Sequence, residues 1–324
     1  MTYRRLGRSG LTVSTIGLGC NNLGRAKTAT QSQEGSDAVV HAALEAGITF
    51  FDVADIYGAE PGLSETRLGA ALGSRRDEVV IGTKFGMDMA GANGRDFAAR
   101  GSRAYIVRAV EASLRRLGTD WIDLYQFHTP DARTPIEETL SALDALITAG
   151  KVRYVGHSNR SGWQIAEAEY VARELGTQRF ISAQNHYNLL DRRAELEVLP
   201  AARAYGLGVL PYFPLANGLL TGKYSQGTAP ADSRLAHVRQ EMVTDADQDQ
   251  LHAFGRFAAE RELREVQVAL GWLAAQDPVA SVIAGATRTE QVAQNAAAVA
   301  FQPTSADLEE LDAMFPAPSA IALF

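Results

Sequence analysis

The stretch Val79-Val80-Ile81-Gly82-Thr83-Lys84 is an apolar run that ends in a charged residue. Two similar runs lie on either side of it in the chain: Ile48-Thr49-Phe50-Phe51 is followed by Asp52, and Leu124-Tyr125-Gln126-Phe127 is followed by His128. Short apolar runs bounded by glycine and charge are typical of parallel strands buried on both faces. The pattern therefore predicts that Asp52, Lys84 and His128 each lie at the carboxyl end of a strand.

Eight strand candidates of this kind alternate with helical patterns along the chain. The strands are expected over Thr15–Gly19, Thr49–Asp52, Val79–Lys84, Leu124–His128, Val152–Ser158, Ile181–His186, Gly208–Phe213 and Ser281–Gly285. Helices are expected over Gly35–Ala46, Ser64–Leu72, Arg103–Leu117, Pro135–Ala149, Trp163–Leu175, Ala194–Tyr205 and Val266–Gln276. Eight βα alternations without a break in composition predict an α/β fold of the (β/α)8 (TIM) barrel type and disfavour a doubly wound sheet.

Other local signals concern the two ends of this barrel. Residues 3–6 and 11–14 flank Gly7-Arg8-Ser9-Gly10, which predicts an N-terminal β-hairpin. The polar segment Ala216–Asp247 follows the seventh strand and is expected to be a functional lid, with a disordered insertion as the alternative. Ser36 is a candidate cap for the first helix, which Gly47 is expected to end.

Composition narrows the class of protein. The 324 residues fit one barrel domain spanning 1–324, and the apolar fraction of 46% is that of an ordinary globular protein. We expect no membrane span and no signal peptide, because no apolar stretch approaches about 20 residues. The single cysteine, Cys20, favours a reducing cytoplasm, and the net charge of −7 argues against nucleic-acid binding. Oligomeric state is left open.

Four ionisable residues suit proton transfer if they converge on the carboxyl face of the barrel: Asp52, Tyr57, Lys84 and His128. A tyrosine titrates near pH 10 and needs a nearby cation to act at neutral pH. Lys84, held by Asp52, is expected to lower the pKa of Tyr57, and His128 to donate a hydrogen bond to a substrate oxygen. Each residue alone has a structural explanation, such as a buried ion pair or a hydrogen-bonded core histidine. Their occurrence around three successive strands favours a catalytic site.

Other common sites have no signature in the chain. The six histidines are scattered, so we expect no metal site. Ser158 lies in Gly156-His157-Ser158-Asn159, which is not a nucleophile elbow. After Gly17-Leu18-Gly19, the next glycine is Gly24, two positions too late for the dinucleotide fingerprint. A nicotinamide cofactor, if bound, is not held by a dinucleotide fold.

Taken together, the motifs resemble those of the aldo-keto reductase superfamily from the N-terminal hairpin to about Asn295. The segment Phe51-Asp52-Val53-Ala54-Asp55-Ile56-Tyr57-Gly58 is similar to the family signature Asp-x4-Tyr-Gly, and Lys84 and His128 match its other two catalytic positions. The loop Gly218-Leu219-Leu220-Thr221-Gly222-Lys223-Tyr224 also resembles that of the β-subunits of voltage-gated potassium channels.

The resemblance implies an NADP(H) site on the same face of the barrel. The cofactor contacts that it implies are Ser158, Asn159, Gln184, Tyr212, Leu215, Lys223, Arg234, Gly285, Thr287, Arg288, Gln291 and Asn295. Within this set, Tyr212 would stack on the nicotinamide ring and Lys223 would contact phosphate. Arg234 and Arg288 are candidates for the 2′-phosphate, which would select NADPH over NADH. An arginine or lysine in a loop is otherwise a solvated surface charge.

Strand-end geometry aims Asn21, Phe85, Tyr187 and Phe213 inward, so these residues are the candidate substrate contacts. Phe213 stands where many members of the family carry serine. His157, by contrast, alternates away from Ser158 and is expected to be structural.

The sequence therefore predicts an NADPH-dependent reductase of an aldehyde or ketone, with Tyr57 as general acid and a small-molecule carbonyl as substrate. The first alternative is a redox sensor or regulatory subunit that holds NADP(H) with little turnover. The second is a barrel isomerase or lyase that uses no nicotinamide.

Overall fold

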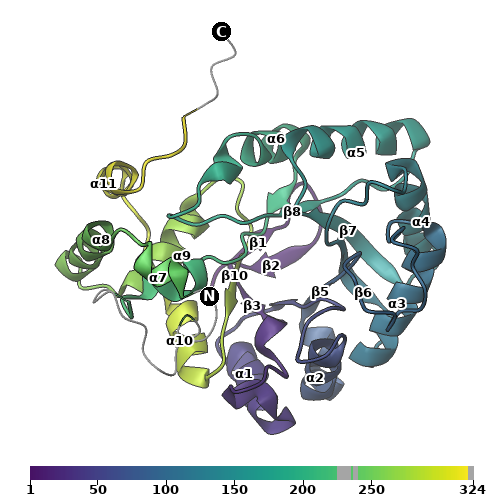
Figure 1. Ribbon diagram of the computed structural model, residues 1–324, viewed down its shortest axis with the longest axis horizontal. Helices are drawn as coiled ribbons and strands as arrows, with labels where there is room; N and C mark the ends of the chain where they lie inside the picture. Colours follow the sequence, from purple (N-terminus) through teal and green to yellow (C-terminus); the bar gives the residue numbers. More distant parts are fainter. Residues whose placement is uncertain (225–234, 236–239, 320–324) are drawn as a thin grey trace.

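The computed structural model describes residues 1–224, 235 and 240–319. Its centre is an eight-stranded parallel sheet in the order β10-β3-β4-β5-β6-β7-β8-β9 (Figure 1). The strands are β3 Ile16–Gly19, β4 Phe50–Asp52, β5 Val80–Phe85, β6 Ile122–Phe127, β7 Val152–Ser158, β8 Ser182–Gln184, β9 Gly208–Val209 and β10 Val282–Gly285. Val209 N donates to Pro278 O at 3.0 Å and Ala280 N donates to Val209 O at 2.9 Å, so backbone bonds also join β9 to the segment that leads into β10. The predicted (β/α)8 barrel is confirmed.

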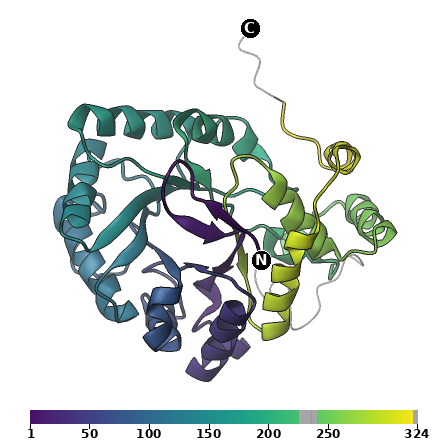
Figure 2. The ribbon, with the colours of Figure 1, turned by 180° about the vertical axis from the view of Figure 1, so that it is seen from behind.

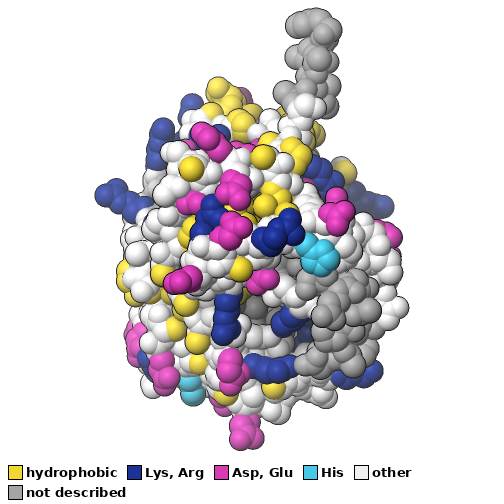
Figure 3. Space-filling model, turned by 90° about the vertical axis from the view of Figure 1, so that its left-hand side faces the viewer, with side chains coloured by type: hydrophobic (Ala, Val, Ile, Leu, Met, Phe, Trp, Pro, Cys, Tyr) yellow, Lys and Arg dark blue, Asp and Glu magenta, His cyan; other side chains and the backbone are white. Residues whose placement is uncertain are grey.

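Helices surround this sheet (Figure 1). Those that follow barrel strands are α1 Gln33–Glu45, α2 Leu63–Leu72, α3 Arg103–Leu117, α4 Ile136–Thr148, α5 Gly162–Leu175, α6 Val198–Tyr205, α9 Glu265–Ala275 and α10 Thr289–Ala297. A further group lies to one side, formed by α7 Glu241–Thr244, α8 Gln248–Glu260 and α11 Ser305–Met314. Figure 3 shows that acidic and basic side chains are interspersed on the face that carries α8. No helix in the described ranges is long and apolar enough to cross a membrane.

Strand alternation sorts the side chains into two populations. Phe51 of β4 packs in the buried layer between the sheet and the helices, together with Ile81 of β5 and Tyr125 of β6. Residues of opposite parity face the barrel interior, where Phe50 packs with Leu124. Because Asp52 and Lys84 share the parity of the interior residues, the strands themselves direct both charges into the barrel.

The predicted N-terminal hairpin is confirmed and closes one end of the barrel. Its strands, β1 Tyr3–Arg5 and β2 Thr12–Ser14, pair antiparallel. Figure 2 shows the hairpin lying across the end of the barrel opposite the view of Figure 1. Leu6, Leu11 and Val13 pack there against Phe50 and Leu124. The amino ends of the strands are thus plugged by apolar side chains, which leaves the carboxyl ends as the open face.

The cap of the first helix differs from the sequence prediction. Ser32, not Ser36, caps α1: its side chain accepts a hydrogen bond from Gly35 N, whereas Ser36 lies inside the helix and donates to Thr30 O at 2.9 Å. The prediction failed because several serines and threonines precede this helix and each suits a cap. Gly47 does follow the end of α1, with a φ of 77°.

The long segment after β9 contains more regular structure than expected. It begins with the 3-10 turns η5 Ala216–Thr221 and includes α7 before the start of α8. Part of this segment lies outside the described residues, so its role as a lid stays a prediction.

Candidate active site

A buried ion pair lies at the carboxyl ends of β4 and β5. The Lys84 side chain is fully buried, and its Nζ donates to Asp52 Oδ2 at 2.7 Å and to Val53 O at 2.8 Å. The other Asp52 oxygen, Oδ1, accepts from Gln184 Nε2 at 2.8 Å and from Gln126 Nε2 at 3.3 Å. Both carboxylate oxygens are therefore satisfied, which is the condition for keeping a charge pair inside a barrel.

Tyr57 lies next to this pair, after β4. Lys84 Nζ is 3.4 Å from the Tyr57 hydroxyl and 4.9 Å from the centre of its ring. Burial lowers the pKa of Lys84, but Asp52 and Tyr57 more than offset this effect and the net pKa is raised. Lys84 is therefore charged at neutral pH, as its proposed role beside a phenol requires.

The pKa of Tyr57 departs from the sequence expectation. Burial raises this pKa more than Lys84 lowers it, and Asp52 adds to the rise. The lowering expected from Lys84 is present, but the net pKa is raised, because the sequence reveals the nearby cation and not the burial of the group. The raised pKa keeps the phenol protonated at neutral pH.

His128 follows β6 and completes the cluster. Its ring lies edge-on to that of Tyr57, with 5.8 Å between the ring centres. Burial, followed by the charge of Lys84, lowers the pKa of His128 to about 3. The imidazole is therefore neutral at pH 7, and its buried Nδ1 has no hydrogen-bond partner among the described residues. The structure brings together all four residues that the sequence singled out: Asp52, Tyr57, Lys84 and His128.

The candidate nicotinamide contacts lie on the next strands around the barrel. Asn159 Nδ2 donates to His128 O at 2.9 Å, and Asn159 Oδ1 accepts from the Tyr212 hydroxyl at 2.7 Å. Ser158 Oγ donates to Gln184 O at 2.7 Å. Hydrogen bonds thus connect these residues to the catalytic candidates, although the Gln184 amide nitrogen is already engaged with Asp52.

The candidate phosphate contacts gather at the end of β10 and the start of α10. Thr287 N and Thr287 Oγ1 both donate to Gln291 Oε1, at 2.7 and 3.2 Å, and Asn295 Nδ2 donates to Gly285 O at 3.4 Å. Arg288 precedes α10 and is exposed. An α-helix presents unpaired backbone N–H groups at its first turn, where they favour an anion.

The remaining cofactor candidates belong to the segment after β9. Leu215 is partly buried, and its carbonyl accepts from Gly218 N at 2.7 Å. Lys223 is exposed. Arg234 lies outside the described residues.

The four candidate substrate residues fall into two groups. Asn21 and Phe213 are partly buried at the carboxyl face, after β3 and β9 respectively. The Phe85 ring is fully buried in the wall and stacks on Phe127 at 5.0 Å. Tyr187 is also fully buried, and its hydroxyl donates to Glu195 Oε1 at 2.7 Å. Phe85 and Tyr187 therefore present no surface to a substrate in this structure. For Phe85 the reason is parity, since adjacent side chains of a strand face opposite sides and Lys84 faces inward.

Two residues of the site were missed in the sequence. Gln126 contacts Asp52, and strand parity could have identified it, since it lies two positions before His128. His186 stacks on Tyr212 with ring centres 5.5 Å apart, and its Nδ1 lies 3.0 Å from Asp191 Oδ2. No local pattern marks His186, because its partners come from a different strand end and from a loop.

The geometry suits a dinucleotide that runs from β7 towards α10. Neutral His128 has an unpaired buried nitrogen at one end of this path. At the other end Gly285 is exposed, and a side chain there would meet Asn22 Nδ2 at 3.0 Å, so glycine keeps the path open. The described residues contain no group of three or more His, Cys, Asp or Glu that could hold a metal ion.

Comparison with known proteins agrees with this arrangement. Residues 15–315 match the model of the aldo/keto reductase family. The uncharacterized oxidoreductase YrpG of Bacillus subtilis (strain 168) is 37% identical, over 98% of this chain and 97% of its own length. A probable voltage-gated potassium channel subunit beta of Oryza sativa subsp. japonica is 37% identical, over 94% of this chain and 92% of its own. The L-glyceraldehyde 3-phosphate reductase of Escherichia coli (strain K12) is 36% identical, over 92% of this chain and 88% of its own.

Proposed function

Because the chain belongs to the aldo/keto reductase family, we propose that it reduces an aldehyde or ketone to an alcohol with NADPH. The observation that carries this proposal is the contact of the buried Lys84 with both Asp52 and Tyr57, beside a neutral His128. This cluster can donate a proton and stabilise the charge left behind, which is what a carbonyl oxygen requires when its carbon accepts a hydride.

Each residue of the cluster has a distinct role in the proposal. The Tyr57 hydroxyl donates its proton to the substrate oxygen. Lys84 stabilises the phenolate that forms, and Asp52 holds the ammonium in place. Neutral His128 donates a ring N–H to the same substrate oxygen and so polarises the carbonyl.

NADPH supplies the hydride when it is bound. We propose that Ser158, Asn159 and Gln184 hold its carboxamide and that Tyr212 packs against its ring. Lys223 and the start of α10 would contact its phosphates, with Arg288 on the 2′-phosphate. The candidate cofactor residues along this path are Leu215, Arg234, Gly285, Thr287, Gln291 and Asn295, of which Arg234 is proposed from sequence alone. Asn21 and Phe213 are the proposed substrate contacts.

The test is the Tyr57→Phe variant with NADPH and a panel of aldehydes, ketones and sugars. We expect turnover, followed by NADPH absorbance, to fall by at least about 10²-fold because the proton donor is lost. NADPH binding, followed by fluorescence, is expected to stay near that of the unaltered protein. The exposed Tyr170 provides a matched control, since Tyr170→Phe removes a hydroxyl far from the site. Turnover of Tyr57→Phe equal to that of the control would refute the role of Tyr57.

A second candidate function is that of an NADP(H)-binding redox sensor with little turnover. The observation in its favour is the similarity to the rice protein described as a probable voltage-gated potassium channel subunit beta. The same substrate panel separates the two functions. Fast NADPH oxidation supports the reductase, whereas retained cofactor without turnover on any carbonyl supports the sensor.

A further inference from the structure

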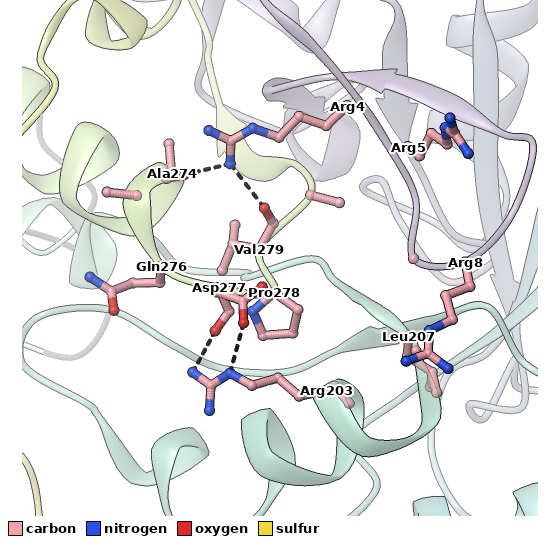
Figure 4. Close-up of a pocket in the computed structure, with 15 residues that line it drawn as sticks. Arg4, Arg5, Arg8, Arg203, Leu207, Ala274, Gln276, Asp277, Pro278 and Val279 are labelled. Carbon is pink, nitrogen blue, oxygen red and sulfur yellow. Dashed lines mark hydrogen bonds and ion pairs between the residues drawn. The ribbon is translucent and has the colours of Figure 1, made fainter.

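A basic cavity lies at the end of the barrel opposite the candidate active site. It has a volume of about 470 Å³, and its charged residues are Arg4, Arg5, Arg8, Arg203 and Asp277. Its walls come from the hairpin, from the turn between α6 and β9 and from the loop between α9 and β10 (Figure 4). These segments precede β9 and β10, so the cavity opens at the amino ends of the strands, whereas Tyr57 and His128 follow strands. We call it the basic cavity.

Two of its arginines are held in place by the protein. Arg4 Nη1 donates to Ala274 O at 2.5 Å and to Val279 O at 3.1 Å. Arg203 donates from Nε to Asp277 Oδ2 at 3.0 Å and from Nη2 to Asp277 O at 2.6 Å. Figure 4 shows these two side chains on either side of the Asp277–Pro278–Val279 loop. A guanidinium has five N–H donors, so both retain donors beyond these bonds.

The other two arginines, Arg5 and Arg8, have exposed side chains. The side chains of Arg5 and Arg8 make no hydrogen bond or ion pair with any residue that the structure describes. Their backbone is nevertheless firmly seated: Arg8 N donates to Gly206 O at 2.8 Å, and a side chain at Gly7 would come within 2.5 Å of the same oxygen. The hairpin turn and the turn before β9 are thus pressed together, which fixes the position from which both arginines extend.

The positive charge of the basic cavity contrasts with the net negative charge of the chain. The lining carries a formal charge of +3 in a chain whose net charge is −7. A second cavity, of about 500 Å³, lies on the other side of the hairpin and is lined by Asp77, Glu78, Asp123 and Arg153. The two cavities at this end therefore carry opposite charge. The basic cavity also falls in the range of about 300–1,000 Å³ that is typical of small-molecule sites.

We propose that the basic cavity binds a small polyanion that carries phosphate or clustered carboxylate groups. Guanidinium groups match the planar, two-pronged geometry of both, and the hydrogen bonds of Arg4 and Arg203 already hold two of the four in place. The site is distinct from the proposed cofactor and substrate site, because the hairpin plug separates the two ends of the barrel.

The experiment is calorimetric titration of the full chain with inorganic tripolyphosphate and, separately, with citrate, each in the absence and presence of saturating NADP+. We expect saturable binding of at least one anion at one site per chain, unchanged by NADP+ and weakened by added NaCl. Tripolyphosphate binding alone would assign a phosphate ligand, and citrate binding alone would assign a carboxylate ligand.

The variant Arg5→Gln/Arg8→Gln removes the two cations that have no partner among the described residues. It is expected to lower anion affinity by at least about tenfold, which corresponds to about 1.4 kcal/mol. The control Arg103→Gln/Arg115→Gln changes net charge equally through exposed residues of α3 and is expected to stay within about twofold. Arg5→Glu, at an exposed position, gives a second test if the double variant fails to fold.

Three results would overturn the proposal: no saturable binding of either anion, equal affinity in the arginine variants and the control, or loss of binding when NADP+ is added. The last result would place the anion at the cofactor site instead. A protein that failed to bind NADP+ would contradict the proposed function, but the effect of Arg5 and Arg8 on anion binding could still be measured.

Discussion

Lys84 is a buried charge on which both the fold and the proposed chemistry depend. Its ammonium contacts Asp52, the Val53 carbonyl and the Tyr57 hydroxyl, and its side chain is fully buried. A buried ion pair adds little net stability, but removing one partner leaves the other charge unpaired. Substitution of Lys84 is therefore expected to lower the free energy of unfolding as well as turnover.

We predict that Lys84→Met lowers the free energy of unfolding by about 3–5 kcal/mol, because Asp52 is then left buried without its cation. Adding Asp52→Asn removes that charge and is expected to restore part of the loss. Urea denaturation of both variants measures the difference, and turnover is expected to be absent in both. Equal free energies of unfolding for Lys84→Met with and without Asp52→Asn would contradict the proposed coupling between these two residues.

His157 illustrates a buried histidine outside the candidate site. It is fully buried against Phe180, and neither ring nitrogen has a hydrogen-bond partner among the described residues. Burial, followed by the charge of Arg160, lowers its pKa well below the usual value. The structural role expected for His157 stays a prediction.

The lowered pKa of His157 predicts an acid-sensitive fold. Above about pH 6.5 both the folded and the unfolded states are neutral at this residue, whereas below it the unfolded state binds a proton that the folded state rejects. His157 is thus expected to lower the free energy of unfolding by about 1.4 kcal/mol per pH unit as pH falls below 6.5. His157→Leu should reduce the slope by about that amount in denaturant titrations between roughly pH 4 and 6, while His128, whose pKa is also lowered, keeps its own contribution. An unchanged slope in His157→Leu would contradict this assignment.

At the scale of elements, the N-terminal hairpin decides which end of the barrel is open. Its residue Leu6 is fully buried and packs with Phe50, Leu124 and Leu210 inside the barrel. The hairpin therefore contributes to the core, although its two strands are only three residues long each.

Leu6→Ala is expected to lower the free energy of unfolding by about 2–5 kcal/mol, since it leaves a cavity in a fully packed plug. The partly exposed Leu175 at the end of α5 offers a control, and Leu175→Ala is expected to change stability by less than about 0.5 kcal/mol. Thermal or urea unfolding measures the free energy of unfolding of both variants. Equal effects in the two variants would mean that the hairpin does not stabilise the barrel.

The elements differ in how far they could be predicted. The strand β7 and the helix α3 have the predicted bounds, and an amphipathic period marks α3 clearly. By contrast, β9 is only two residues long, although a longer strand was expected there. Helices α8 and α11 were not predicted, and both lie outside the βα alternation on which the prediction was based.

At the scale of the whole molecule, the proposal assigns different ligands to the two ends of the barrel. NADPH and a carbonyl substrate belong to the carboxyl face, and a small polyanion to the basic cavity beside the hairpin. A ligand that binds only the folded state stabilises it by mass action.

We therefore predict that NADPH at about 100 times its Kd raises the melting temperature by roughly 5 °C, which corresponds to about 2.7 kcal/mol. Arg288→Ala is expected to weaken this shift for NADPH much more than for NADH, because only NADPH carries the 2′-phosphate. Arg115→Ala, on α3, is the control. Equal losses for both cofactors in Arg288→Ala would remove Arg288 from the 2′-phosphate site.

The sequence by itself determined the barrel and the four residues at its carboxyl face, because apolar period and strand-end position are local properties of the chain. Strand parity could have placed Phe85 and Gln126, but the sequence could not determine the net pKa of Tyr57 or the contacts of His186. Those depend on how deeply each group is buried and on neighbours from distant strands. The basic cavity could not be predicted from the sequence either. Its arginines lie in two segments almost 200 positions apart, and only the closed barrel brings them together.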